Sequence, residues 1–221
     1  MPRIRIKICC IQSAEEARRA ITAGADALGL VGTMPSGPGP IDDALIAAIA
    51  AAVPPPVATF LLTSETEAQA IIAHARRCHA NTLQLVDQIA PGAYAELRAA
   101  LPGIRLVQVI HVGGPAALAE ARALAPLVDA LLLDSGRPHE AIKVLGGTGR
   151  THDWALSREI VAAAPCPVFL AGGLRADNVA AAIAAVRPFA VDICTGVRRP
   201  DYALDPARLD AFVAAVATAS A

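Results

Sequence analysis

Short apolar runs alternate with alanine-rich segments along the chain, and this alternation repeats eight times. The apolar runs are rich in leucine and β-branched residues and show little polar alternation, as expected of strands buried on both faces. The alanine-rich segments have a helical period and are bounded by capping residues, glycine or proline. The predicted strands span residues 4–11, 27–31, 57–62, 82–86, 105–111, 130–134, 168–171 and 191–194, and the predicted helices span residues 13–23, 42–52, 63–78, 91–100, 113–125, 153–164, 178–186 and 207–217.

Strands buried on both faces and joined by helices form a parallel sheet that helices cover. Eight such units in 221 residues fit an α/β fold of the (β/α)8 TIM barrel type better than an open doubly wound sheet. No linker or low-complexity segment divides the chain, so we expect a single domain over residues 1–221. At the first helix, Ser13 followed by Glu16 predicts a capping box.

Charge and composition narrow the class of partner. The net charge is −1, with 19 basic and 20 acidic residues interspersed, which argues against nucleic acid or an anionic membrane and favours a small molecule. Charged and turn residues break every apolar stretch before it is long enough to span a bilayer. The five cysteines are scattered without metal-ligand spacing, so we expect no metal and, without a signal peptide, a reducing cytoplasmic location.

Two strand ends carry candidate acid–base residues, because barrel enzymes place their active sites at the carboxyl ends of the strands. Asp134 follows three leucines, and a carboxyl group in apolar surroundings has a raised pKa that suits a general acid. The alternative is a capping or salt-bridged aspartate. Cys9 ends the first strand and suits a general base if a cation lowers its pKa, whereas a buried structural thiol is the alternative. Cys10 is expected to point to the opposite side and to pack.

Three glycine clusters follow the last three strands. They are Gly146 to Gly149, Gly172-Gly173, and Thr195-Gly196. Loops of this kind let backbone N–H groups close around an anion, and barrels often build a phosphate site at these strand ends. Glycines used only for turn geometry are the alternative for any one cluster. Because the three clusters follow neighbouring strands and should converge on one side of the barrel mouth, we interpret them as a phosphate site.

Several motifs occur in the order found in one known family. They are Lys7-Ile8-Cys9, the segment 24–30, Gln84-Leu85, Leu132 to Ser135, Gly146 to Gly149 with Asp153-Trp154, Leu170 to Leu174 with Asn178-Val179, and 187–192 with Gly196-Val197. Together these motifs resemble phosphoribosylanthranilate isomerase of tryptophan biosynthesis over nearly the whole chain.

The resemblance implies a barrel enzyme without a cofactor that isomerises a phosphosugar by an Amadori rearrangement. Asp134 matches the general acid that opens the ribose ring, and Cys9 matches the general base that removes the C2' proton. The residues that match the phosphate site are Gly147, Gly149, Gly172, Gly173, Thr195 and Gly196. Gln84, His111 and Arg137 are expected to line the rest of the substrate pocket.

The departures from the family pattern concern the aromatic end of the substrate. Cys10 stands where the family has glycine, and the loop 34–40 lacks the basic residue that binds the anthranilate carboxylate. Val86-Asp87 replaces a usual His-Gly, and Arg198 replaces a glutamate; Arg137, Arg198 and Arg199 are candidates to supply the missing cation.

These departures leave two alternatives to the isomerase. One is a divergent paralogue that acts on another phosphosugar or merely binds it without catalysis, and the other is a different phosphate-handling enzyme that shares only the fold. The pattern does not determine the oligomeric state.

Overall fold

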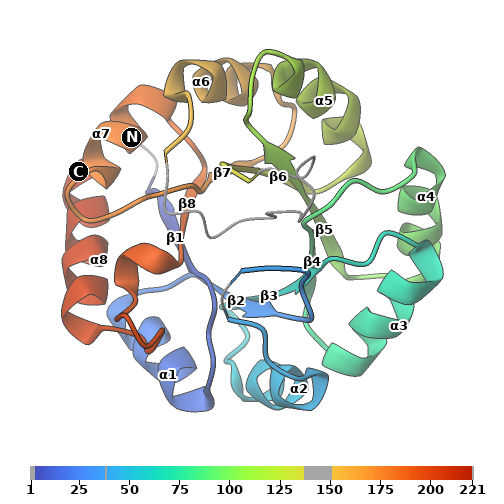
Figure 1. Ribbon diagram of the computed structural model, residues 1–221, viewed down its shortest axis with the longest axis horizontal. Helices are drawn as coiled ribbons and strands as arrows, with labels where there is room; N and C mark the ends of the chain where they lie inside the picture. Colours follow the sequence, from blue (N-terminus) through green and yellow to red (C-terminus); the bar gives the residue numbers. More distant parts are fainter. Residues whose placement is uncertain (1–2, 38, 137–150, 221) are drawn as a thin grey trace.

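The structure is a computed structural model that describes residues 3–37, 39–136 and 151–220. Over these residues the chain forms a closed barrel of eight parallel strands in sequential order, and the helices form a ring around it (Figure 1). The predicted TIM barrel is therefore confirmed. Within the described residues, no helix combines the length and the apolar character that a membrane crossing requires.

The elements follow the predicted alternation closely. The strands are β1 (Arg5–Ile8), β2 (Ala27–Val31), β3 (Ala58–Thr63), β4 (Thr82–Leu85), β5 (Arg105–His111), β6 (Ala130–Asp134), β7 (Val168–Leu170) and β8 (Ala190–Ile193). The helices are α1 (Ala14–Ala23), α2 (Asp43–Ala52), α3 (Ala68–Cys78), α4 (Pro91–Ala100), α5 (Ala116–Leu124), α6 (Trp154–Ala163), α7 (Val179–Val186) and α8 (Pro206–Ser220), with short 3-10 turns η1 (Ala125–Leu127) and η2 (Thr195–Val197).

Pairing of β1 with β8 closes the barrel, from Arg5 opposite Ala190 to Ile8 opposite Ile193. Most strand residues are buried on both faces, and all five residues of β2 are buried. One apolar cluster fills the inside of the barrel and a larger one lies between the strands and the helices. This double burial explains why the strand sequences lack polar alternation.

Several element boundaries differ from the predictions, and two of these differences have a clear structural cause. The first strand ends at Ile8 rather than residue 11, because Cys10 has a φ of 62°, which no strand accommodates. Helix α3 begins at Ala68 rather than residue 63, since residues 64–67 form a loop above β3.

The predicted capping box of α1 forms only in part. Ser13 accepts a hydrogen bond from the Glu16 N–H (3.1 Å), as expected for a helix cap. The Glu16 carboxylate, however, accepts from the N–H of Gln12 rather than that of Ser13 (3.0 Å), and from the Leu204 N–H (2.8 Å). Glu16 therefore also ties α1 to the segment after β8.

Candidate active site

A buried ion pair lies beneath the mouth of the barrel. Lys7 is fully buried, and its Nζ lies 2.9 Å from Oδ2 of Asp192, its neighbour across the β1–β8 pairing. Burial alone would lower the pKa of Lys7, but the Asp192 carboxylate raises it above its ordinary value, so the ammonium stays charged. The sequence motifs assign no role to either residue. The available signal was a charged residue between two apolar neighbours in each strand, Lys7 between two isoleucines and Asp192 between valine and isoleucine.

Cys9 lies just beyond β1 and shares its surroundings with Lys7. A Cβ atom at Gly29 of β2 would lie 2.7 Å from Cys9 Sγ and 3.1 Å from Lys7 Nζ, so both side chains occupy the space that this glycine leaves. The hydrogen bond with Cys10 and burial raise the pKa of Cys9 well above 9, and the Lys7 charge only partly offsets this. The expected cation is present, but Cys9 remains a thiol in the ligand-free protein.

Asp134 ends β6, opposite His111 of β5 in the strand register. Burial raises the pKa of Asp134 above 3.8, although the hydrogen bond from the Ser135 N–H and the electrostatic interaction with His111 lower it. Ser135 donates to Asp134 Oδ1 at 2.7 Å. A carboxyl group with a raised pKa at the carboxyl end of a barrel strand fits the expected general acid.

The structure brings Cys9 and Asp134 to one electrostatic environment. Lys7 and Asp192 act on the pKa values of both residues, with Asp192 raising each and Lys7 lowering each. Cys9, Asp134 and Asp192 come from strands at three positions around the barrel, so they meet only once it closes.

Buried polar atoms around this mouth have no hydrogen-bond partner within the described part of the chain. They are Gln84 Oε1, His111 Nδ1, His152 Nδ1, Trp154 Nε1 and Asp192 Oδ1. Buried polar atoms in native proteins are normally paired, so these atoms are available to bind a polar ligand or water. His111 Nε2 donates to the Val86 carbonyl at 2.9 Å, which directs Nδ1 elsewhere. The predicted pocket residues Gln84 and His111 belong to this set.

The β7 and β8 glycine clusters lie side by side. Gly172 and Gly173 have φ values of 84° and 61°, a left-handed conformation that favours glycine. A Cβ atom at Gly196 would lie only 2.3 Å from the Leu174 carbonyl oxygen, so the two loops approach here. Asn178 holds the first loop by donating to the Gly173 carbonyl (3.0 Å). The remaining predicted residues Gly147, Gly149 and Arg137 lie outside the described residues.

His152 lies against Gly172, and the sequence motifs did not predict it as a site residue. Its Nδ1 would lie 2.8 Å from a Cβ atom at Gly172, and its Nε2 lies 2.8 Å from Ser157 Oγ. The Ser157 hydroxyl donates to the Asp153 carbonyl, so it accepts from His152 Nε2. Burial lowers the pKa of His152 to about 4, so the ring is neutral and presents the Nδ1 lone pair. The only signal was its place directly after the glycine loop.

Replacing Gly196 with alanine is expected to destabilise the fold by about 1–3 kcal/mol, because the new methyl group meets backbone rather than a movable side chain. Chemical unfolding measures this change. Gly92→Ala is the matched control, since no atom lies within 4 Å of its Cβ position and alanine favours the α4 helix. Equal unfolding free energies for the two variants would contradict the close approach.

The loop after β2 packs on Cys10. Gly39 has a φ of 88°, and a Cβ atom there would lie 2.8 Å from Cys10 Cβ. Cys10 belongs to the same interior cluster as Cys9, so the expectation that it points to the opposite side was wrong. The left-handed backbone at Cys10 ends the alternation of a strand and also explains the glycine of the resembling family.

Arg198 does not supply the missing cation at the ring end of the pocket. Its side chain is only 2% exposed and pairs with Glu16 at 2.7 Å. It also donates to the Cys9 carbonyl at 3.0 Å. Arg198 therefore anchors the backbone of Cys9 instead.

A second polar cluster lies outside the barrel wall, where Asp43, His74 and Cys78 place their polar atoms within 4.8 Å of one another. His74 bonds Thr63 (2.9 Å) and Asp43 (3.1 Å), and Arg77 donates to Asp43 (2.7 Å). Burial and the Asp43 charge raise the pKa of Cys78 to about 12, so it is a neutral thiol beside a guanidinium. We interpret the cluster as a network that fastens α3 to α2.

Comparison with known proteins gives one consistent family. The family model for N-(5'phosphoribosyl)anthranilate (PRA) isomerase matches residues 6–215. Two enzymes named N-(5'-phosphoribosyl)anthranilate isomerase are similar to the chain. The enzyme of Methanocella arvoryzae is 36% identical, and the match covers 87% of this chain and 88% of that enzyme. The enzyme of Haloferax volcanii is 38% identical, and the match covers 97% of this chain and 94% of that enzyme.

A solved phosphoribosyl anthranilate isomerase in complex with reduced 1-(o-carboxyphenylamino)-1-deoxyribulose 5-phosphate superposes with a TM-score of 0.81. It is 25% identical, and the match covers 97% of this chain and 99% of that one. Family model, relatives and fold agree over nearly the whole length. The chain belongs to the N-(5'-phosphoribosyl)anthranilate isomerase family.

Proposed function

We propose that this protein converts N-(5'-phosphoribosyl)anthranilate to 1-(o-carboxyphenylamino)-1-deoxyribulose 5-phosphate in tryptophan biosynthesis. Family membership supports this reaction, and a related structure holds the reduced form of this product. The observation that carries the proposal is the placement of Asp134 and Cys9 around one Lys7–Asp192 ion pair. The family assignment favours this isomerisation over a non-catalytic phosphosugar binder.

Asp134 acts first as the general acid. It gives its proton to the ribose ring oxygen as the bond from that oxygen to C1' breaks, and the anthranilate nitrogen supplies the electron pair that forms an iminium. The raised pKa of Asp134 keeps a protonated fraction available for this step.

Cys9 acts second as the general base. Its thiolate removes the C2' proton, and the electron pair moves into the iminium to give a neutral enolamine, which tautomerises to the ketone. The nearby Lys7 ammonium stabilises the thiolate, although Cys10 and burial oppose it. The reaction therefore uses the small fraction of protein in which Cys9 is a thiolate while Asp134 is protonated.

The phosphate group binds, in this proposal, at the wall formed by Gly172, Gly173, Thr195 and Gly196, together with Gly147 and Gly149. Two left-handed glycines in sequence direct backbone N–H groups into a concavity that suits an anion. Gln84 and His111 line the remaining pocket, and their unpartnered atoms support this part of the assignment. Arg137 lies outside the described residues and is assigned to the pocket from the sequence alone.

The direct test is turnover by the purified protein. We expect formation of the carboxyphenylamino-deoxyribulose phosphate from N-(5'-phosphoribosyl)anthranilate without added metal or cofactor, followed by absorbance and product chromatography. The absence of turnover at saturating substrate, in protein shown to be folded, would remove the proposal. A cytoplasmic location remains a prediction, supported by the finding that none of the five cysteines, all of which the structure describes, forms a disulfide.

The pH profile of kcat/KM depends on the pKa values of Asp134 and Cys9. Because the active form needs protonated Asp134 and ionised Cys9, with the pKa of Cys9 above that of Asp134, kcat/KM rises with pH through the Asp134 pKa. It then stays level and falls only above the raised Cys9 pKa. We expect no decline near pH ~8.5, where an ordinary cysteine titrates.

Cys10→Gly removes the largest cause of that raised pKa. The alkaline decline of kcat/KM should then move to lower pH, and the plateau should rise because the two pKa values approach each other. Cys166→Ala, at a cysteine between α6 and β7, should leave the profile unchanged. An unshifted alkaline limb in Cys10→Gly would show that Cys9 is not the group that titrates.

A further inference from the structure

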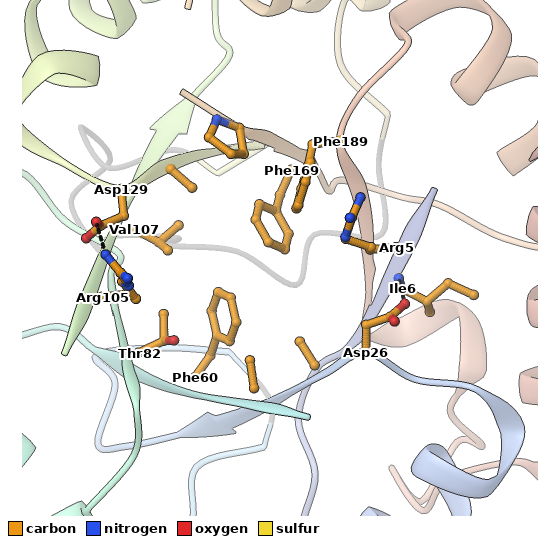
Figure 2. A pocket seen from close by; sticks show the side chains of 14 residues that line it. Arg5, Ile6, Asp26, Phe60, Thr82, Arg105, Val107, Asp129, Phe169 and Phe189 are labelled. Carbon is orange, nitrogen blue, oxygen red and sulfur yellow. Dashed lines mark hydrogen bonds and ion pairs between the residues drawn. The ribbon is translucent and has the colours of Figure 1, made fainter. Parts of the chain in front are cut away.

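A cavity of about 370 Å³ opens at the amino-terminal ends of the strands, the end of the barrel opposite Cys9 and Asp134. Three of the four phenylalanines of the chain line it: Phe60, Phe169 and Phe189 (Figure 2). Its volume lies near the lower end of the range for small-molecule sites, about 300–1,000 Å³. The proposed isomerisation makes no use of this cavity.

The cavity exists because small side chains occupy the barrel interior at the amino-terminal ends of the strands. Ala27, Ala58 and Ala130 begin β2, β3 and β6, positions where larger side chains usually fill a barrel of this type. The Phe60 and Phe169 rings close the cavity above, in an edge-to-face contact with centroids 5.6 Å apart. Phe189 continues this aromatic wall 5.8 Å from Phe169. Such a wall favours a flat ring.

The rim of the cavity has an excess of positive charge. Asp26 and Asp129 already pair with arginines, at 2.6 Å from Arg3 and at 3.1 Å from Arg105. Arg5 has no carboxylate partner within the described residues: it contacts the Arg3 carbonyl at 3.5 Å and lies 4.2 Å from the Phe189 ring centre. Figure 2 shows Arg5 and Arg105 on opposite sides of the opening, with the rings of Phe60 and Phe169 between them.

We propose that this cavity is a second binding site, which takes a single-ring aromatic carboxylate. The ring enters between Phe60, Phe169 and Phe189, where it loses contact with water. The carboxylate stays at the rim, where the Arg5 guanidinium offers a planar pair of donors that matches it. The site is separate from the catalytic mouth, so its occupancy does not require the substrate.

Benzoate is the probe, and benzamide is the matched neutral ring. In NMR titrations of the whole protein, benzoate should shift the backbone signals of Ala27, Ala58 and Ala130, and benzamide should bind at least tenfold more weakly because it lacks the charge. Shifts confined to Cys9 and Asp134, equal binding of the two probes, or no saturable shift below about 10 mM would each overturn the proposal.

Two variants keep the test sharp. Arg5→Gln changes an exposed side chain and should weaken benzoate binding at least tenfold while benzamide binding stays unchanged. Ala58→Leu fills the cavity and should abolish binding of both probes. Arg18→Gln, which removes an exposed positive charge on the outer face of α1, is the control. Equal benzoate affinity in Arg5→Gln and Arg18→Gln would overturn the role of Arg5.

Discussion

Replacing Asp134 with asparagine is expected to lower kcat for the isomerisation by about 10²–10⁴-fold, the usual contribution of a general acid. Asparagine keeps the shape of the side chain and still accepts from the Ser135 N–H, so KM should change little. What it lacks is the transferable proton. Steady-state kinetics with N-(5'-phosphoribosyl)anthranilate measures both constants.

Stability separates this catalytic effect from misfolding. The raised pKa of Asp134 means that burial disfavours its charged form. The carboxylate therefore costs stability in full above its folded-state pKa, and this cost is lost as the pH falls from that pKa towards the lower unfolded-state pKa. The neutral asparagine should therefore unfold no more easily than the wild type at pH 7. Asp210→Asn, on the exposed part of α8, is the control and should retain full activity. A kcat within threefold of wild type in Asp134→Asn would exclude Asp134 as the acid.

Replacing Cys9 with alanine is expected to lower kcat by a similar factor, about 10²–10⁴, because the C2' proton then lacks its base. Alanine fits the same buried space without a polar atom, so the barrel should remain folded. The two losses should differ in kind. Cys9→Ala retains Asp134 and still opens the ring, whereas Asp134→Asn does not.

Hydride trapping distinguishes the two steps. Borohydride added during incubation with substrate should reduce the open-chain imine in Cys9→Ala, giving an open-chain amine detectable by mass spectrometry. Asp134→Asn should give little of this amine. Cys166→Ala serves as the control for removal of a cysteine, and its turnover should match the wild type. Trapping in Asp134→Asn at the level of Cys9→Ala would reverse the proposed assignment of roles.

The local sequence was sufficient for the architecture. Apolar runs without polar alternation need burial on both faces, and eight of them in this length close most readily into a barrel, whose packed interior buries one face while the helices bury the other. The same rule placed Asp134 and Cys9 at the catalytic mouth, since a residue that follows a parallel strand lies at the carboxyl edge. Helix starts at Ser13, Asp42 and Asp153 follow from side chains that cap the neighbouring N–H groups.

Distant contacts decided the rest. The pairing of Lys7 with Asp192, 185 residues later, exists only because β8 lies beside β1, and it sets the charge around both proposed catalytic groups. The sequence offers Arg198 as a cation for the substrate, but in the fold its guanidinium pairs with Glu16 and donates to the Cys9 carbonyl. The backbone at Cys10 depends on how Gly39 packs against it. The chain by itself thus determined the barrel and the positions of the proposed acid and base, because both depend on local burial and strand direction. Only the closed tertiary structure determined their protonation and the cavity beneath them, because these depend on which distant side chains meet inside the barrel.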